Sequence, residues 1–132
     1  MSQRKKYVFP YVHYPVLPIQ FIYKEKETPI IAALIDSGGD SIVIPKAIAQ
    51  YLGSNMEETD AAKTAGGTAS LLKTSLDMVI GREDQKIVYK NIEVFIVDSN
   101  DVPVLVGRHP LFDDFEITFK KKKGHIVLIE AQ

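Results

Sequence analysis

The chain has 132 residues, contains no cysteine, and carries a formal net charge of −1 from 16 basic and 17 acidic side chains. A chain of this length fits one domain, and without cysteine it forms neither disulfides nor thiolate metal sites. The near-neutral balance gives no general attraction to nucleic acid or membranes. No apolar stretch is long enough to span a bilayer, and the basic N-terminal residues lack the apolar segment of a secretory signal, so we expect a soluble cytoplasmic protein.

The first 14 residues are basic and then aromatic, and their alternation from Tyr7 onward predicts a strand with one apolar face. Two interpretations of this segment stay open: it packs on its own domain, or it crosses to a second subunit. We therefore divide the chain into an N-terminal arm, residues 1–14, and a main domain, residues 15–132.

The next part of the domain consists of short apolar runs bounded by turn residues. These runs predict strands over residues 17–23, 30–35 and 42–44, with a charged turn after the first. Pro45 at the first helical position and Gly53 after the last one predict a helix over residues 46–52. The polar residues 54–62 predict a loop.

The second half of the domain continues this pattern of strands and turns. Strands are predicted over residues 71–80, 87–89, 92–97, 102–106, 115–119 and 126–129. Charged turns separate several of them. Short strands with regular turns indicate a mostly β fold.

One apolar run ends abruptly at Asp36, and Ser37 and Gly38 follow before a second apolar run begins. Because apolar runs bounded by turn residues are typical of buried strands, we expect Asp36 at a strand end, on a tight glycine loop. A carboxylate in such apolar surroundings is costly to bury, so it requires bonding partners or a function.

The segment Ile35-Asp36-Ser37-Gly38, followed by a small residue and Asp40, resembles the active-site segment of retropepsin-like aspartic proteases. The later segment Val104-Leu105-Val106-Gly107-Arg108 resembles the apolar run ending in Gly-Arg that the same family carries. The resemblance covers about residues 15–119. It implies a small closed β-barrel with one or two short helices, one of them beginning around residues 109–112.

The resemblance also implies an aspartic endopeptidase with Asp36 as its catalytic residue. Such an enzyme needs two carboxylates that share one proton, and the chain has only one Asp-Ser-Gly triplet, since residues 98–100 lack the glycine. We therefore expect a symmetric homodimer, with one Asp36 from each subunit and a peptide or protein substrate between them. The alternative for Asp36 is a carboxylate that caps a turn.

The resemblance also implies supporting roles for residues around Asp36. The Ser37 hydroxyl is expected to bond across the dimer axis, and Gly38 to let the backbone approach the substrate. Asp40 is expected to pair with Arg108, which follows Gly107, and so to hold the active-site loop. The alternative for Arg108 is an ordinary surface cation.

Residues 64–70 are small and uncharged. In the resembled family, a glycine-containing hairpin here closes over the substrate as a flap, which implies that role for Ala65, Gly66, Gly67 and Thr68. The alternative is a plain loop.

The sequence lacks the motifs of metal sites, serine hydrolases and phosphate-binding loops. The three histidines are far apart without paired spacing, so we expect no metal and no cofactor. Neither a nucleophile elbow nor a phosphate-binding loop is present. Two alternatives to a general peptidase stay open: a non-catalytic peptide-binding or dimerisation module with the same fold, and a processing enzyme that cleaves a single partner.

Overall fold

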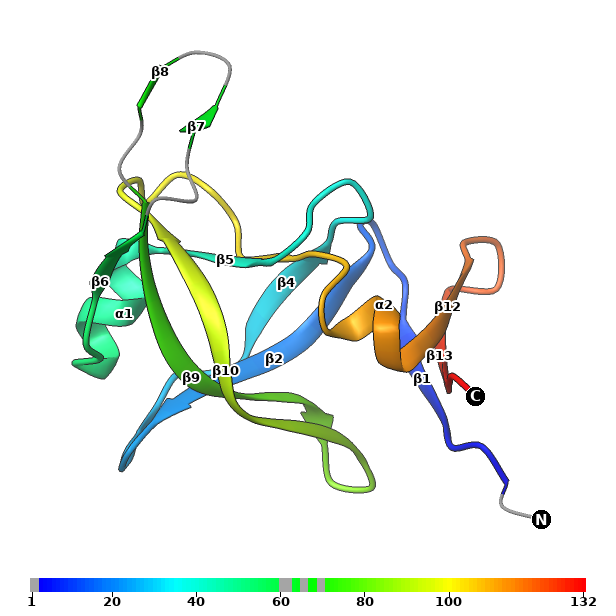
Figure 1. Cartoon of the computed structure of the whole chain (residues 1–132). Helices are drawn as coiled ribbons and strands as arrows, with labels where there is room; N and C mark the ends of the chain where they lie inside the picture. The colour runs from blue at the N-terminus through cyan, green and yellow to red at the C-terminus, as the bar shows by residue number, and fades with distance from the viewer. Residues whose placement is uncertain (1–2, 60–62, 65–66, 69–70) are drawn as a thin grey trace.

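The computed structural model describes residues 3–59, 63–64, 67–68 and 71–132, with only the backbone described at residues 63–64 and 67–68. Six strands form a closed barrel, because the first and the last strand of their hydrogen-bonded order also pair with each other (Figure 1). In order around the barrel they are β2 (Val16–Tyr23), β4 (Ile31–Ile35), β11 (Leu105–Val106), β5 (Ile42–Pro45), β10 (Gln85–Val97) and β9 (Leu71–Arg82).

Short strands extend the barrel sheet at both ends. β3 (Lys26–Glu27) pairs with β2, and β6 (Glu57–Thr59) pairs with β9. The prediction of a loop over residues 54–62 was wrong for β6, whose exposed acidic residues gave no apolar alternation, and residues 60–62 of that prediction lie outside the described residues. The long β9 supplies the backbone partners instead, with Lys73 opposite Glu57.

The N-terminal and C-terminal parts of the chain form a second sheet of three antiparallel strands. Its order is β1 (Lys6–Pro10), β13 (His125–Glu130), β12 (Phe115–Lys120). The arm strand β1 thus pairs within its own chain, and the buried Tyr7 and Phe9 confirm the apolar face expected there. The division of the chain at residue 14 stays a prediction.

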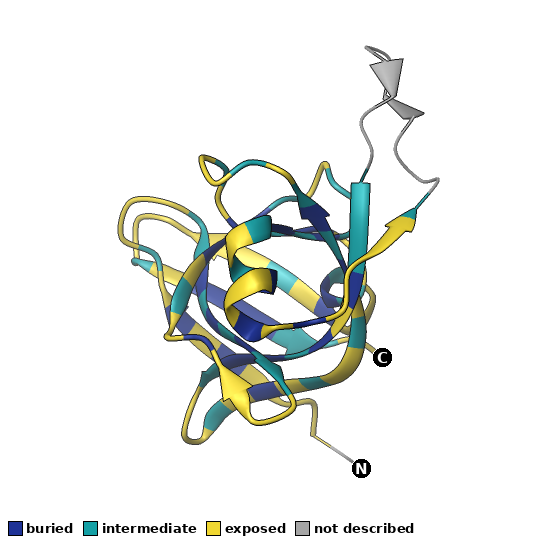
Figure 2. Cartoon of the chain, turned by 90° about the vertical axis from the view of Figure 1, so that its left-hand side faces the viewer, coloured by how far each residue is buried: buried dark blue, intermediate teal, exposed yellow. Residues whose placement is uncertain are grey.

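Helix α1 (Lys46–Leu52) begins and ends at the predicted residues. Gly53 ends it in the left-handed region, at φ 67°, and donates its N–H to the Gln50 carbonyl. Figure 2 shows α1 lying across one opening of the barrel, where it buries Ala49 and Leu52. The helix therefore closes one end of the core.

Two strand boundaries differ from the sequence-based prediction. The expected strands over residues 87–89 and 92–97 are one strand, β10, with a bulge between Tyr89 and Ile92. The expected strand over residues 102–106 is reduced to β11, preceded by Pro103, which has no N–H for a ladder. Polar residues at a bulge resemble a turn in sequence, while apolar residues outside a ladder resemble a strand.

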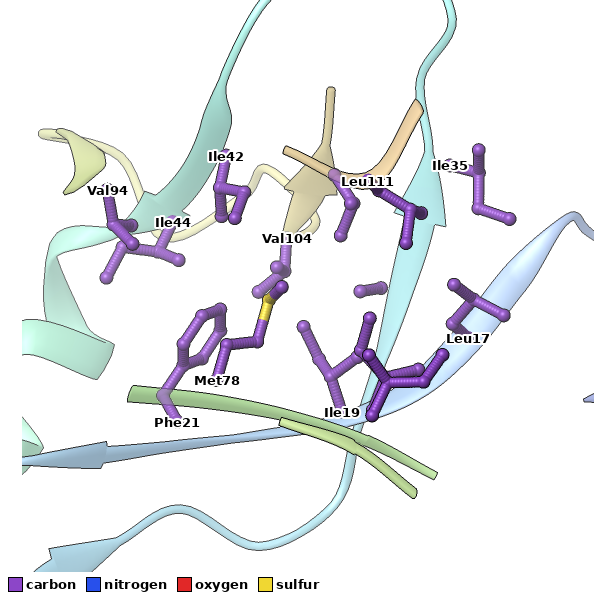
Figure 3. Close-up of a cluster of buried hydrophobic side chains, with 14 of the residues drawn as sticks. Leu17, Ile19, Phe21, Ile35, Ile42, Ile44, Met78, Val94, Val104 and Leu111 are labelled. Atoms are coloured by element: carbon purple, nitrogen blue, oxygen red, sulfur yellow. The ribbon is translucent and has the colours of Figure 1, made fainter. Parts of the chain in front are cut away.

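The barrel interior is filled by apolar side chains from all six strands. Figure 3 shows a part of this cluster. Alternate residues of β2 point inward, namely Leu17, Ile19 and Phe21, which are almost fully buried. Neither described helix has the length or apolar character to cross a membrane.

The short helix α2 (Leu111–Asp114) is tied to the barrel by one side-chain hydrogen bond. The Tyr89 hydroxyl donates to Asp114 Oδ2 at 2.8 Å. Burial, followed by this hydrogen bond to the carboxylate, raises the pKa of Tyr89. The bond therefore favours the protonated phenol in the folded protein.

We expect Tyr89→Phe to lower the free energy of unfolding by about 0.5–1.5 kcal/mol at neutral pH, because it removes one hydrogen bond. The folded pKa lies above the unfolded one, so this contribution is complete below the unfolded pKa of about 10 and is lost as the pH rises beyond it. Urea denaturation from about pH 8 to 11 should show wild type losing stability more steeply than Tyr89→Phe. The control Tyr14→Phe, at an exposed ring, should follow wild type; parallel curves for all three proteins would contradict the assignment.

Candidate active site

Asp36 follows directly after β4 and continues its ladder by one residue. Its N–H donates to the Val106 carbonyl at 2.9 Å, so the base of the loop is held by β11. Its half-buried carboxylate accepts the Gly38 N–H on Oδ1 at 3.0 Å. A turn-capping aspartate makes the same bond, so this contact alone does not separate the two interpretations.

The carboxylate lies close over the two glycines that follow it. A Cβ at Gly39 would lie 2.8 Å from Asp36 Oδ2, while a Cβ at Gly38 would lie 3.4 Å from Oδ1. The first distance is a clash and the second is an ordinary contact. The tighter steric requirement thus falls on Gly39, the small residue of the motif, which was not among the predicted site residues.

The segment after β11 clamps the loop through its backbone. Three consecutive N–H groups donate to loop carbonyls: Gly107 to Ser41 (3.1 Å), Arg108 to Gly39 (2.8 Å) and His109 to Asp40 (3.0 Å). At Gly107 the two backbones are so close that a Cβ would lie 2.5 Å from the Ser41 carbonyl oxygen. The requirement for glycine at position 107 therefore has a steric cause, and the supporting role of Gly107 at the site stays a prediction.

Arg108 and Asp40 lie together as the motifs predicted. Arg108 Nη2 donates to Asp40 Oδ1. The two side chains are 54% and 83% exposed, so in the single chain this pair contributes at most about 1 kcal/mol. The backbone clamp therefore positions the loop more strongly than the ion pair does.

The remaining predicted site residues differ in what the structure describes. Ser37 is exposed, and its hydroxyl has no hydrogen-bond partner among the described residues of the chain. Ala65 and Gly66 lie outside the described residues. Gly67 and Thr68 form strand β8 (Gly67–Thr68), which pairs antiparallel with β7 (Lys63–Thr64). The flap role of this segment stays a prediction.

A row of half-buried apolar side chains crosses the outer face of the barrel near Asp36. Leu105 lies opposite both Leu34 and Val43, and Phe95 lies opposite Val43. Strand alternation puts Leu34 on the same face as Asp36, while Ile35 points into the core. Sequence reasoning missed this row, because uniformly apolar runs hide which residues face outward.

A pocket of about 280 Å³, lined by Ser41 and His109, lies next to the Asp36 loop. A larger groove of about 620 Å³ runs between the arm and the outer faces of β2 and β4, and Asp36 does not line it. The described residues contain no cluster of three or more His, Asp or Glu side chains arranged to hold a metal ion.

The fold resembles those of three solved structures. The chain aligns with a retropepsin-like aspartic protease from Rickettsia conorii at a TM-score of 0.65 and 18% identity, covering 99% of this chain and 98% of that one. EIAV protease complexed with the inhibitor HBY-793 aligns at 0.53 and 18%, covering 76% and 86%. The retroviral protease-like domain of Ddi1 from Leishmania major aligns at 0.50 and 11%, covering 87% and 92%.

The chain has a retropepsin-like fold. The predicted fold class, a small closed β-barrel with one or two short helices, is therefore confirmed. No family model matches the sequence, and no curated protein matches it. Because the identities are low, the structural neighbours establish the retropepsin-like fold, and the role of each site residue is argued from this chain's own geometry.

Proposed function

We propose that the protein is an aspartic endopeptidase that acts as a homodimer and hydrolyses peptide bonds with a water molecule activated between two copies of Asp36. The observation that carries this proposal is the loop after β4. It presents a half-buried carboxylate on a retropepsin-like barrel and is clamped by the backbone of Gly107 and Arg108. A loop held in this way keeps a reacting group in one orientation.

The second carboxylate is proposed to come from a second subunit. Among the described residues of one chain, the only hydrogen bond to the Asp36 carboxylate comes from the Gly38 N–H. A two-fold axis beside the loop would bring the two Asp36 side chains together. The Ser37 hydroxyl, which lacks a partner in the described part of its own chain, would then bond across that axis.

The proposed reaction consumes one water and forms no covalent intermediate with the protein. Two carboxylates brought side by side in this way share one proton, because two negative charges so close together repel each other. The ionised Asp36 takes a proton from water, whose oxygen attacks the peptide carbonyl carbon, while the protonated Asp36 donates to the carbonyl oxygen. The tetrahedral intermediate then breaks its C–N bond, and the Asp36 that took the proton from water passes it to the leaving amine. The other Asp36 recovers its proton from a hydroxyl of the intermediate as the carboxylic acid product forms.

The apolar row beside Asp36 supports a preference for apolar side chains next to the cleaved bond. Leu34, Val43 and Leu105 are half-buried, so they offer apolar surface that a substrate side chain can cover. In a symmetric dimer the same row would occur on both sides of the cleaved bond. Apolar residues are therefore expected on both sides of the cut.

Cleavage of a mixed peptide library from about pH 4 to 7 tests this function, because the proposed reaction needs a carboxylate pair that holds a single shared proton. Wild type and the control Asp84→Asn, at an exposed turn, should cut preferentially between apolar residues, and Asp36→Asn should not cut. Equal cleavage by wild type and Asp36→Asn would contradict the site assignment. No cleavage by a folded, dimeric wild type would instead favour a binding module.

A further inference from the structure

The groove between the N-terminal arm and the outer faces of β2 and β4, which we call the arm groove, has no part in the proposed reaction. Its volume is about 620 Å³, and Asp36 does not line it. Sites for small ligands have volumes of about 300–1,000 Å³ and are mostly apolar, with a few polar groups. The arm groove is therefore a candidate for a second binding site.

Most of the side chains that line the arm groove are apolar, and several of them are open to solvent. Val12 is 68% exposed, Tyr14 is 70% exposed and Ile30 is 44% exposed. Val16 and Pro18 of β2 line the groove from the barrel side and are half-buried. Exposed apolar side chains that gather around one concave surface indicate a binding site more strongly than scattered ones do.

The arm is held in place by two other parts of the chain. The Val8 N–H donates to Gln85 Oε1, in the β9–β10 hairpin, at 2.9 Å. Further along the arm, Lys121 Nζ donates to the carbonyls of Val12 at 2.9 Å and His13 at 3.4 Å. The wall of the arm groove is therefore formed without a ligand, which lowers the conformational cost of binding one.

The arm groove has basic side chains in its lining and complements a negative charge. Arg82 and His13 line it, and none of the described acidic side chains does, although Glu83 and Asp84 follow Arg82 in the β9–β10 turn. Arg82 is exposed, and its guanidinium forms no hydrogen bond or ion pair within the described part of the chain. A guanidinium binds a carboxylate through two parallel hydrogen bonds. The groove thus suits a ligand with an apolar body and a carboxylate.

We infer that the arm groove binds the carboxyl-terminal end of an apolar peptide, with the terminal carboxylate on Arg82 and the apolar side chains against Val12, Tyr14 and Ile30. The choice of this ligand rests on the proposed function, because cleavage between apolar residues releases a fragment that ends in an apolar residue with a free carboxylate. The protein therefore holds one product of its own reaction at a surface away from Asp36.

Polar groups in the lining favour a peptide over a fatty acid, which also combines an apolar body with a carboxylate. The Tyr14 hydroxyl, the His13 ring and Gln85 Nε2 have no hydrogen-bond partner among the described residues. The backbone N–H and C=O groups of a peptide can bond to them, whereas an acyl chain would cover these groups without bonding to them.

Fluorescence anisotropy with the peptide Gly-Leu-Val-Phe, labelled with fluorescein at its amino end, tests the role of the carboxylate. The free acid should bind wild type about tenfold or more tightly than the carboxyl-terminal amide does, because only the acid pairs with Arg82. Arg82→Gln should remove this difference. Lys86→Gln, which removes the same charge at an exposed position outside the groove, should bind both peptides as wild type does. Equal binding of acid and amide by wild type, or no binding of either, would overturn the inference.

The apolar contact is tested by a second matched pair of variants. Ile30→Ser should weaken binding of the free acid about threefold or more, because the ligand covers Ile30 in the groove. Val88→Ser is the control, since Val88 is 47% exposed and does not line the groove. Tighter binding of decanoate than of the peptide would show that the groove is a site for acyl chains, and the inferred peptide would be wrong.

The Asp36→Asn variant separates this site from the proposed active site. It should bind the free-acid peptide as wild type does, because Asp36 does not line the arm groove. Binding that is lost in Asp36→Asn but unchanged in Arg82→Gln would place the peptide at the Asp36 loop, which overturns the inference and leaves the proposed function intact. Binding that depends on Arg82, in a wild type that cleaves no peptide, would support the groove while the proposed function fails.

Discussion

Peptide cleavage is expected to fall with the square of the wild-type fraction when wild-type and Asp36→Asn chains are refolded together, so that an equal mixture retains about one quarter of the wild-type rate. If each active site takes one Asp36 from each subunit, only dimers of two wild-type chains have a complete dyad. Pure Asp36→Asn should lose about 10²–10⁴-fold or more, because asparagine can neither take a proton from water nor hold the shared one.

Asp84→Asn chains in place of Asp36→Asn chains are the control for this mixture, since Asp84 is exposed in the β9–β10 turn. Their addition should leave the rate per chain unchanged. A linear fall with the Asp36→Asn fraction would mean that each chain carries a complete site by itself. That outcome would contradict the shared dyad even if Asp36 remained essential.

The sequence predicted those parts of the fold that are determined by a few residues adjacent in the chain. Pro45 and Gly53 set both ends of α1 through backbone geometry that depends on single residues. The contact between Asp40 and Arg108 was expected because two short motifs resemble those of a known family, and the structure contains that contact. Each of these features depends on a few adjacent residues.

The parts that sequence did not predict depend on partners far along the chain. β6 exists because β9 offers backbone groups to it, and its own side chains carry no strand pattern. The order β1-β13-β12 joins the two ends of the chain, and no local pattern specifies it. The outward direction of Leu34 and Leu105 was hidden by apolar neighbours on both sides.

Replacing Gly107 by alanine is expected to reduce both stability and cleavage strongly. A Cβ there would lie 2.5 Å from the Ser41 carbonyl oxygen, 2.6 Å from the Ser41 nitrogen and 2.8 Å from the Gly39 carbonyl oxygen. All three atoms belong to the backbone of the active-site loop, so no side-chain rotation relieves the clash. We expect a loss of about 1–3 kcal/mol or more in the free energy of unfolding, as for other overpacked interiors.

The loss of activity should exceed what the loss of stability explains, because the loop that must move is the one that carries Asp36. Gly53→Ala is the matched control: its φ of 67° disfavours alanine, at a cost of about 1 kcal/mol, but a Cβ there meets nothing within 4 Å. Urea denaturation and kcat/KM at a temperature where both variants are folded separate the two effects. Normal kcat/KM in a folded Gly107→Ala protein would show that the close approach of β11 to the loop does not position Asp36.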